Sequence, residues 1–305
     1  MVNIVYPTKH RSNFFGFTLL EVLLATVISL VLFSVVFRSY FGAKDVYTKQ
    51  TAMARLTEDI RFANFFLQQN IMHAGFAGCR NLAELNLINH TALDFSEYTV
   101  VQGYSSESVP GYLKRIVARN TDVIVITKAN SDITEVRADV VIGADRIKVQ
   151  RHPATNGNQY LLIADCVNAE LFVAKNFTGD TVITEDSLHN VYRAGSAQVS
   201  RFTELAFFIS NTGRVTVANQ PIYSLYFSTN RGNKRELITE INDMQIVYGV
   251  DIYGQGRVAK YLKAQTITDL KLWDRVLAVV ITLQSQHKLR AVKSWQIYIK
   301  LRARC

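Results

Sequence analysis

The sequence lacks charge over a long stretch: among the twenty-one residues from Phe17 to Phe37, only Glu21 carries a charge. As an α-helix rising ~1.5 Å per residue, the stretch would be about 32 Å long, and the hydrocarbon core of a bilayer is roughly 30 Å thick. A carboxylate at mid-bilayer costs on the order of 2.5–3.5 kcal/mol, so another group should offset that cost. We therefore predict a membrane-spanning helix at 17–37 whose single acid has a function.

Acidic residues are also missing from residues 1–16, which contain the basic run Lys9-His10-Arg11. By the positive-inside rule, this short flank stays in the cytoplasm and the chain after the helix is exported. An ordinary secretory signal has a small-residue cleavage site after its apolar stretch. No such site follows Phe37, whereas a small residue, Gly16, directly precedes the stretch. The order of parts is therefore not that of an ordinary secretory signal.

Sequence patterns of catalysis are absent as well. The six histidines are scattered without H-E-x-x-H spacing, and the chain has neither a G-x-S-x-G elbow nor a P-loop. The loop 251–257 contains one acid, Asp251, whereas a calcium loop needs several oxygen ligands at alternating positions. We expect no enzyme, no catalytic residue, no metal and no other cofactor.

The chain has only three cysteines, Cys79, Cys166 and Cys305. Export would place them in an oxidising compartment, where disulfides persist. We favour Cys79–Cys166, because Cys79 follows a long helix and Cys166 lies in a strand-like run that could pack beside it. The rival pair is Cys166–Cys305. Metal binding by these cysteines is not expected, since no two are close in sequence.

Proline is absent between Pro7 and Pro110, so a long helix can continue beyond the membrane. After Gly42, apolar residues recur at steps of three, four and seven, which gives one helical face. These residues are Val46, Met53, Leu56, Ile60, Ala63, Leu67 and Ile71. The pattern predicts one helix from about 17 to 73, ~85 Å long, that Gly75 and Gly78 end.

Beyond residue 95 the sequence changes to short β-branched and aromatic runs separated by polar turns, which is typical of strands. The expected strands are 98–102, 122–127, 146–150, 159–164, 170–175, 204–210, 222–228, 244–250, 275–284 and 293–302. We predict an α+β fold in which the long helix packs on an antiparallel β-rich head. The predicted parts are a leader at 1–16, a helix at 17–75 and a head at 76–305.

The run Gly16-Phe17-Thr18-Leu19-Leu20-Glu21 resembles the class III signal of type IV pilins and related pseudopilins. The resemblance implies that a prepilin peptidase cuts between Gly16 and Phe17 and methylates the new amino terminus of Phe17. It also implies that the amine of an incoming subunit meets Glu21 of a neighbour, with Thr18, Leu19 and Leu20 in the same assembly segment. The alternative is a plain signal anchor, in which Glu21 reaches toward the cytoplasmic surface.

Later segments resemble the PilW-like minor pilins of type IV pili. The clearest run is Leu237–Asp251, followed by Trp273 and the run Val276–Leu283. Weaker matches are Ala77-Gly78-Cys79, Thr121–Ile126 and Ala164–Phe172.

The resemblance implies a minor pilin that takes part in initiating or capping a type IV pilus. Its partners would be the prepilin peptidase and other minor and major pilins. It would sit in the inner membrane with its head in the periplasm, and then in the pilus at the cell surface. Two alternatives stay open: a type II secretion pseudopilin of the J kind, and a pilus-tip adhesin or DNA-contacting module. Basic residues outnumber acidic ones, 34 to 25, but they are spread along the chain, which favours a solvated face over a DNA site.

Overall fold

The computed structural model describes residues 18–91, 93, 100–130, 132–151, 159–216, 218–286 and 292–302. By its internal contacts the chain divides into two units, Met1–Glu58 and Asp59–Cys305. The predicted leader at 1–16 and the first predicted helical residue, Phe17, lie outside the described residues. The observed architecture is the predicted α+β combination of one long helix and a large β-rich head.

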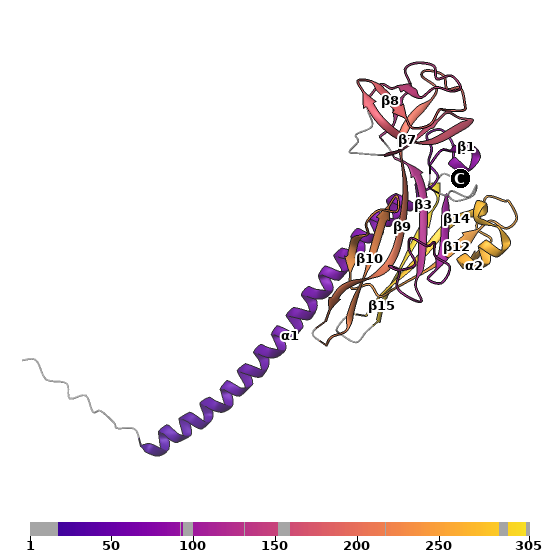
Figure 1. Cartoon of the computed structure of the whole chain (residues 1–305). Helices are drawn as coiled ribbons and strands as arrows, with labels where there is room; N and C mark the ends of the chain where they lie inside the picture. Colours follow the sequence, from indigo (N-terminus) through magenta and orange to yellow (C-terminus); the bar gives the residue numbers. More distant parts are fainter. Residues whose placement is uncertain are drawn as a thin grey trace, which may run out of the picture. The chain divides into compact units, whose positions relative to one another are not determined.

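Helix α1 (Leu19–Ile71) is a single helix of 53 residues, about 80 Å long (Figure 1). Its end agrees with the predicted stop. The backbone of Gly75 has φ 77° and that of Gly78 has φ 96°, which are left-handed conformations that favour glycine. The N–H of Gly75 donates to the carbonyl of Thr127 at 2.7 Å, so the chain passes directly from the helix to the sheet.

The predicted apolar stripe is buried in the part of α1 that belongs to the second unit. Ile60, Ala63, Leu67 and Ile71 are all buried there. Phe66 adds ring contacts, with centroids 6.1 Å from Phe207 and 5.1 Å from Phe227. In the first unit the stripe is mixed, because Leu56 is buried whereas Val46 is 52% exposed.

The larger sheet of the head is mostly antiparallel and has the path β11-β10-β9-β6-β7-β8-β5, with β1 on β7, and β3 and β4 on β9. Strand β2 pairs in turn with β3. The bounds are β1 Asn86–Asn89, β2 Val101–Ser105, β3 Asp122–Ala129, β4 Thr134–Glu135, β5 Arg146–Lys148, β6 Gln159–Ala164, β7 Asn168–Thr178, β8 Thr181–Thr184, β9 Gln198–Val215, β10 Pro221–Thr229 and β11 Arg235–Thr239.

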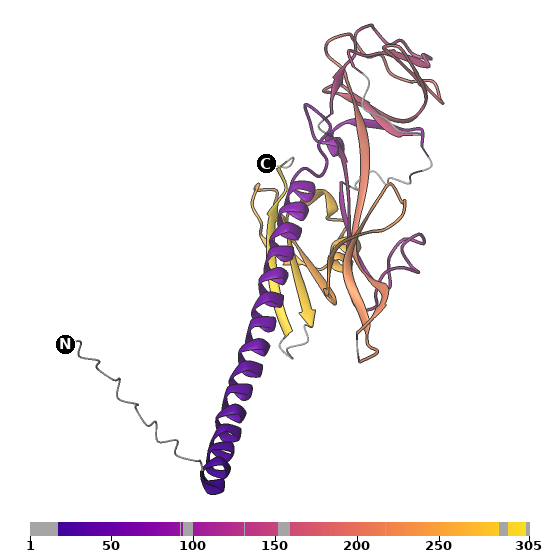
Figure 2. The same ribbon diagram turned by 90° about the vertical axis from the view of Figure 1, so that its left-hand side faces the viewer.

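Strand β9 joins the two ends of this sheet. Its first residues pair with β4 and β6, and its later residues pair with β3 and β10. Figures 1 and 2 both show β9 running from the side of β3 and β10 to the side of β7 and β8. One apolar core lies at each end. Phe172 and Tyr192 belong to the first core, and Leu113 and Phe208 to the second.

A second sheet has the order β13-β12-β14-β15. Its strands are β12 Asp243–Val250, β13 Lys260–Leu262, β14 Val276–Gln286 and β15 Val292–Lys300, and the short helix α2 (Ala264–Leu270) follows β13. The two sheets are joined through β3 and β12, because the carboxylate of Asp122 accepts a hydrogen bond from the N–H of Ile246 at 2.8 Å.

Most predicted strands are present, with shifted ends. The prediction at 159–164 coincides with β6, whereas 204–210 is only the middle of β9. The prediction at 98–102 overlaps β2 at 101 and 102, and residues 98 and 99 lie outside the described part of the chain. The elements β1, β4, β8, β11, β13 and α2 were not predicted from the sequence. These are short elements, whose periodicity is weak.

Gly103 of β2 provides a packing test of the head. A methyl group on Gly103 would collide with the phenol ring of Tyr248, which is fully buried and 5.0 Å from the ring of Trp273. We predict that Gly103→Ala lowers the free energy of unfolding by about 1–3 kcal/mol, because overpacking forces neighbours to shift. The measurement is urea unfolding of the detergent-solubilised chain, followed by tryptophan fluorescence.

The matched control is Gly111→Ala, because a Cβ at that position meets nothing within 4 Å. Its free energy of unfolding should stay within about 0.5 kcal/mol of the unmodified chain. Equal stability of the two variants would contradict the packing described for Tyr248.

Candidate functional site

The predicted assembly segment lies at the start of α1. Gly16 and Phe17, the predicted cleavage and methylation residues, lie outside the described residues, whereas Thr18, Leu19, Leu20 and Glu21 are described. Thr18 directly precedes the helix. The N–H of Glu21 donates to the Thr18 carbonyl at 3.1 Å, and its distance to the Thr18 hydroxyl oxygen is 3.3 Å. Thr18 therefore satisfies an N–H group that has no partner within the helix.

Sequence reasoning missed this cap, although its signal is present. The spacing Thr18-x-x-Glu21 is that of a capping box, a pattern that marks helix starts. Glu21 also lies in the first turn, where the helix dipole favours a negative charge by about 0.3–1 kcal/mol. The position of the acid is thus consistent with the start of the helix as well as with the predicted pairing between subunits.

The surface of α1 beyond Glu21 is apolar and exposed. Leu19 is 81% exposed and Leu30 is 70% exposed, and the next charged residue after Glu21 is Arg38. Among the described residues, α1 is the one helix long and apolar enough to cross a membrane. Soluble surfaces rarely expose a continuous apolar area of this kind, so lipid or other helices must cover it.

Polar side chains within this apolar stretch are internally satisfied. The hydroxyls of Thr26, Ser29 and Ser34 donate to backbone carbonyls one turn earlier at 2.7–2.8 Å. In a hydrocarbon environment an unsatisfied hydroxyl would cost several kcal/mol. Ala25 and Ser29 follow Glu21 at steps of four, so one helical face joins the carboxylate to small side chains. Small residues allow another helix to approach closely.

The disulfide joins Cys79 to Cys166, whose Cα atoms are 5.7 Å apart, across 87 residues of sequence. This confirms the favoured pair, and the rival Cys166–Cys305 is wrong. Cys79 follows the end of α1, and Cys166 lies in the turn between β6 and β7. The carboxylate of Asp165 shapes that turn by accepting the N–H groups of Val167 and Asn168, each at 2.7 Å.

A cleft of about 1000 Å³ lies beside the disulfide in the second unit. Its cations include Lys128 and Arg302. The pKa of Lys128 is lowered by burial, and its Nζ donates to the amide oxygen of Asn70 at 2.9 Å. The pKa of His73 in the same cleft is lowered by burial and by the positive charges of Lys128 and Arg302. Positive side chains in the cleft lining, Arg80, Lys128, Arg201 and Arg302, outnumber the acids, Glu84 and Asp132.

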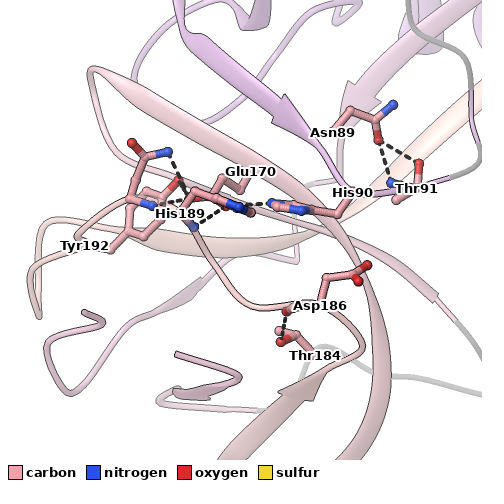
Figure 3. A network of polar contacts seen from close by, with 9 residues as sticks. Asn89, His90, Thr91, Glu170, Thr184, Asp186, His189 and Tyr192 are labelled. Carbon is pink, nitrogen blue, oxygen red and sulfur yellow. Dashed lines mark hydrogen bonds and ion pairs between the residues drawn. The ribbon is translucent and has the colours of Figure 1, made fainter. Parts of the chain in front are cut away.

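A further polar network surrounds Glu170, which is fully buried (Figure 3). Its Oε1 accepts the N–H and side-chain amide of Asn190 at 2.7 and 2.9 Å and the hydroxyl of Tyr192 at 3.2 Å. Its Oε2 accepts the N–H of His189 at 2.9 Å and lies 2.7 Å from Nε2 of His90. Burial alone would raise the pKa of Glu170, but these hydrogen bonds bring the pKa below its ordinary value.

Loop 251–257 directs backbone amides toward its one acid, Asp251. The N–H of Gly256 donates to the Asp251 carboxylate at 2.6 Å, and hydrogen bonds from the loop lower the pKa of Asp251. The loop itself therefore supplies hydrogen-bond donors to the carboxylate.

Comparison with known families gives one match: residues 206–294 match the family model of the type IV pilus-assembly protein W. The matched range includes all of β10, β11, β12, β13, α2 and β14. It contains the clearest runs of the resemblance described above, Leu237–Asp251 and Val276–Leu283. The match supports a role in type IV pilus assembly, and with the apolar helix it supports a location in the cell envelope. No curated protein and no solved structure matches the chain.

The disulfide should contribute to stability through the long loop that it closes. We predict that replacing both Cys79 and Cys166 by serine lowers the free energy of unfolding by about 4–5 kcal/mol, as the entropic model gives for a loop of this length. The control is Cys305→Ser, which leaves the bridge intact and should leave stability unchanged. Denaturant unfolding under non-reducing conditions measures both. A loss below about 1 kcal/mol in the double variant would contradict the prediction.

Proposed function

We propose that the chain is a minor pilin that takes part in initiating or capping a type IV pilus. The observation that carries the proposal is the exposed apolar start of α1 with its single acid. An exposed helix of this kind can lie in a membrane and later pack among other helices in a fibre. The family match to a pilus-assembly protein supports the same function.

In this proposal a prepilin peptidase cleaves between Gly16 and Phe17, and the new amine of Phe17 is methylated. Glu21 then needs a cation, because an unpaired charge in an apolar environment is far more costly than a paired one. The amine of an incoming subunit can supply that cation. Other minor and major pilins are therefore the proposed partners, and the pairing sets the axial position of each subunit.

The orientation follows from the flanks of the helix. The basic residues before Gly16 favour a cytoplasmic amino terminus, which places the head in the periplasm. The disulfide supports this orientation, because such bonds persist in oxidising compartments. The proposed path runs from the inner membrane to the pilus.

Removal of the acid tests the assembly role. We predict that Glu21→Ala is produced and anchored at wild-type levels but fails to restore surface pili in a deletion strain, because the incoming amine has no partner. Counts of pili by electron microscopy and membrane fractionation measure the two effects. Wild-type pilus numbers in this variant would contradict the role of Glu21.

The matched control is Glu58→Ala, which removes an exposed acid from the same helix outside the apolar stretch. It should restore pili fully. Secretion of extracellular enzymes in the deletion strain distinguishes the alternative: lost secretion with normal pili would indicate a type II secretion pseudopilin.

The mature amino terminus gives a second test. We predict that mass spectrometry of the protein from its native membrane finds N-methylated Phe17 as the first residue. In a strain without the prepilin peptidase, or in a Gly16→Trp variant, the chain should begin before position 16. A mature chain that starts after Phe37 would contradict the proposed function.

A further inference from the structure

The network around Glu170 brings together two histidines that are far apart in the sequence. His90 follows β1, and Glu170 belongs to β7, and these two strands pair in parallel with Ile88 opposite Glu170. The N–H of His90 donates to the carbonyl of Leu171 at 2.9 Å, so the backbone fixes where the His90 side chain begins. His189 comes from the segment after β8.

We propose that His90, Glu170 and His189 bind one divalent transition-metal ion, with Zn²⁺ as the best fit. Their ligand atoms all lie within 4.8 Å of one another. Zn²⁺ takes imidazole nitrogen and carboxylate oxygen at about 2.0–2.2 Å in a tetrahedron, so two ligands stand about 3.3 Å apart. The distances from Glu170 Oε2 to His90 Nε2 and His189 Nδ1, 2.7 and 3.9 Å, lie on either side of that value.

The hydrogen bonds of Glu170 suit a ligand that is held in place. Oε1 accepts three hydrogen bonds from Asn190 and Tyr192, which fix the orientation of the carboxylate. Oε2 accepts one backbone N–H, from His189, and directs its remaining lone pair toward His90. Hydrogen-bond partners that orient a metal-ligating side chain in this way tune and stabilise metal sites.

The charge of Glu170 gives a reason for a cation at this position. The carboxylate is fully buried, and its ion-pair partners among the described residues are both histidines. When both histidines are neutral, the buried negative charge has hydrogen-bond donors but no counter-charge. Buried charges are least costly when they are also paired or coordinate metals. A divalent ion between the three side chains would neutralise it.

Binding requires a small rearrangement that the structure permits. The rings of His90 and His189 are stacked, with centroids 4.9 Å apart and planes 16° from parallel, so both lone pairs do not meet at one point. The side chain of His189 is 63% exposed and can turn, which also gives the ion an entry path. Ligation by His90 Nε2 requires the neutral tautomer that carries its proton on Nδ1.

The test is direct titration of the metal-free, detergent-solubilised full chain with Zn²⁺ alone, without a polyhistidine tag. We expect one ion per chain, a higher thermal unfolding midpoint with Zn²⁺, and visible absorption of a tetrahedral site with Co²⁺. His189→Ala should weaken Zn²⁺ binding at least about tenfold. It should change the unfolding midpoint of the metal-free chain only slightly, because the backbone N–H to Glu170 remains and only contacts of an exposed ring are lost.

The matched control is His73→Ala, which removes a histidine of the same unit outside the cluster and should bind Zn²⁺ as the unmodified chain does. Equal Zn²⁺ affinity in the unmodified chain and in His189→Ala would overturn the proposal. So would binding that His73→Ala weakens as much as His189→Ala does. These readouts do not depend on pilus assembly.

Discussion

A single carboxylate on an apolar, exposed helix surface is the constraint on which the rest of the molecule depends. From Leu19 to Phe37 the large side chains of α1 are exposed, and water is a poor solvent for such an area. The stretch must therefore be covered by lipid or by other helices. The hydroxyls of this stretch donate to its own backbone carbonyls. Glu21 is therefore the one side chain of the stretch that needs a partner, because its charge is costly in a hydrocarbon environment.

At the start of the head, the disulfide joins the segment after α1 to the turn before β7. Gly75 and Gly78 end the helix, and Cys79 is tied to the turn that starts β7. That bond brings the segment after α1 beside β7, and the parallel pairing of β1 with β7 continues the same contact. The position of His90 next to Glu170 follows from this pairing. One covalent link thus holds the segment after the long helix beside β7, the strand that carries Glu170.

Much of this could be predicted from the sequence. The helix and most strands follow from local signals: spacing of apolar residues, absence of proline, and alternation. The disulfide was only the favoured of two pairs, because no local signal decides between Cys79 and Cys305 as the partner of Cys166. Three features had no such signal. The 18-residue β9 is read as one strand only once its partners on both ends are known. Asn211-Thr212-Gly213 is typical of a turn, yet it lies within β9. There the side chain of Asn211 accepts the N–H of Gly213, and the register between β9 and β10 shifts at the facing residues Pro221 and Tyr223. His90 and Glu170 are eighty residues apart, so only the fold shows that they meet.

Glu21 and Glu170 are both carboxylates that need compensation for their charge in an apolar environment, but their surroundings differ. A buried carboxylate needs donors or a cation, and in the head two backbone N–H groups, an amide and a hydroxyl are available to Glu170. On a helix the N–H groups are already bonded to carbonyls, except in the first turn, and Thr18 takes one of those. Glu21 therefore lacks the set of hydrogen-bond donors that the head supplies to Glu170. In the proposed function, cleavage before Phe17 would create a new cation, the amino terminus, four residues before Glu21.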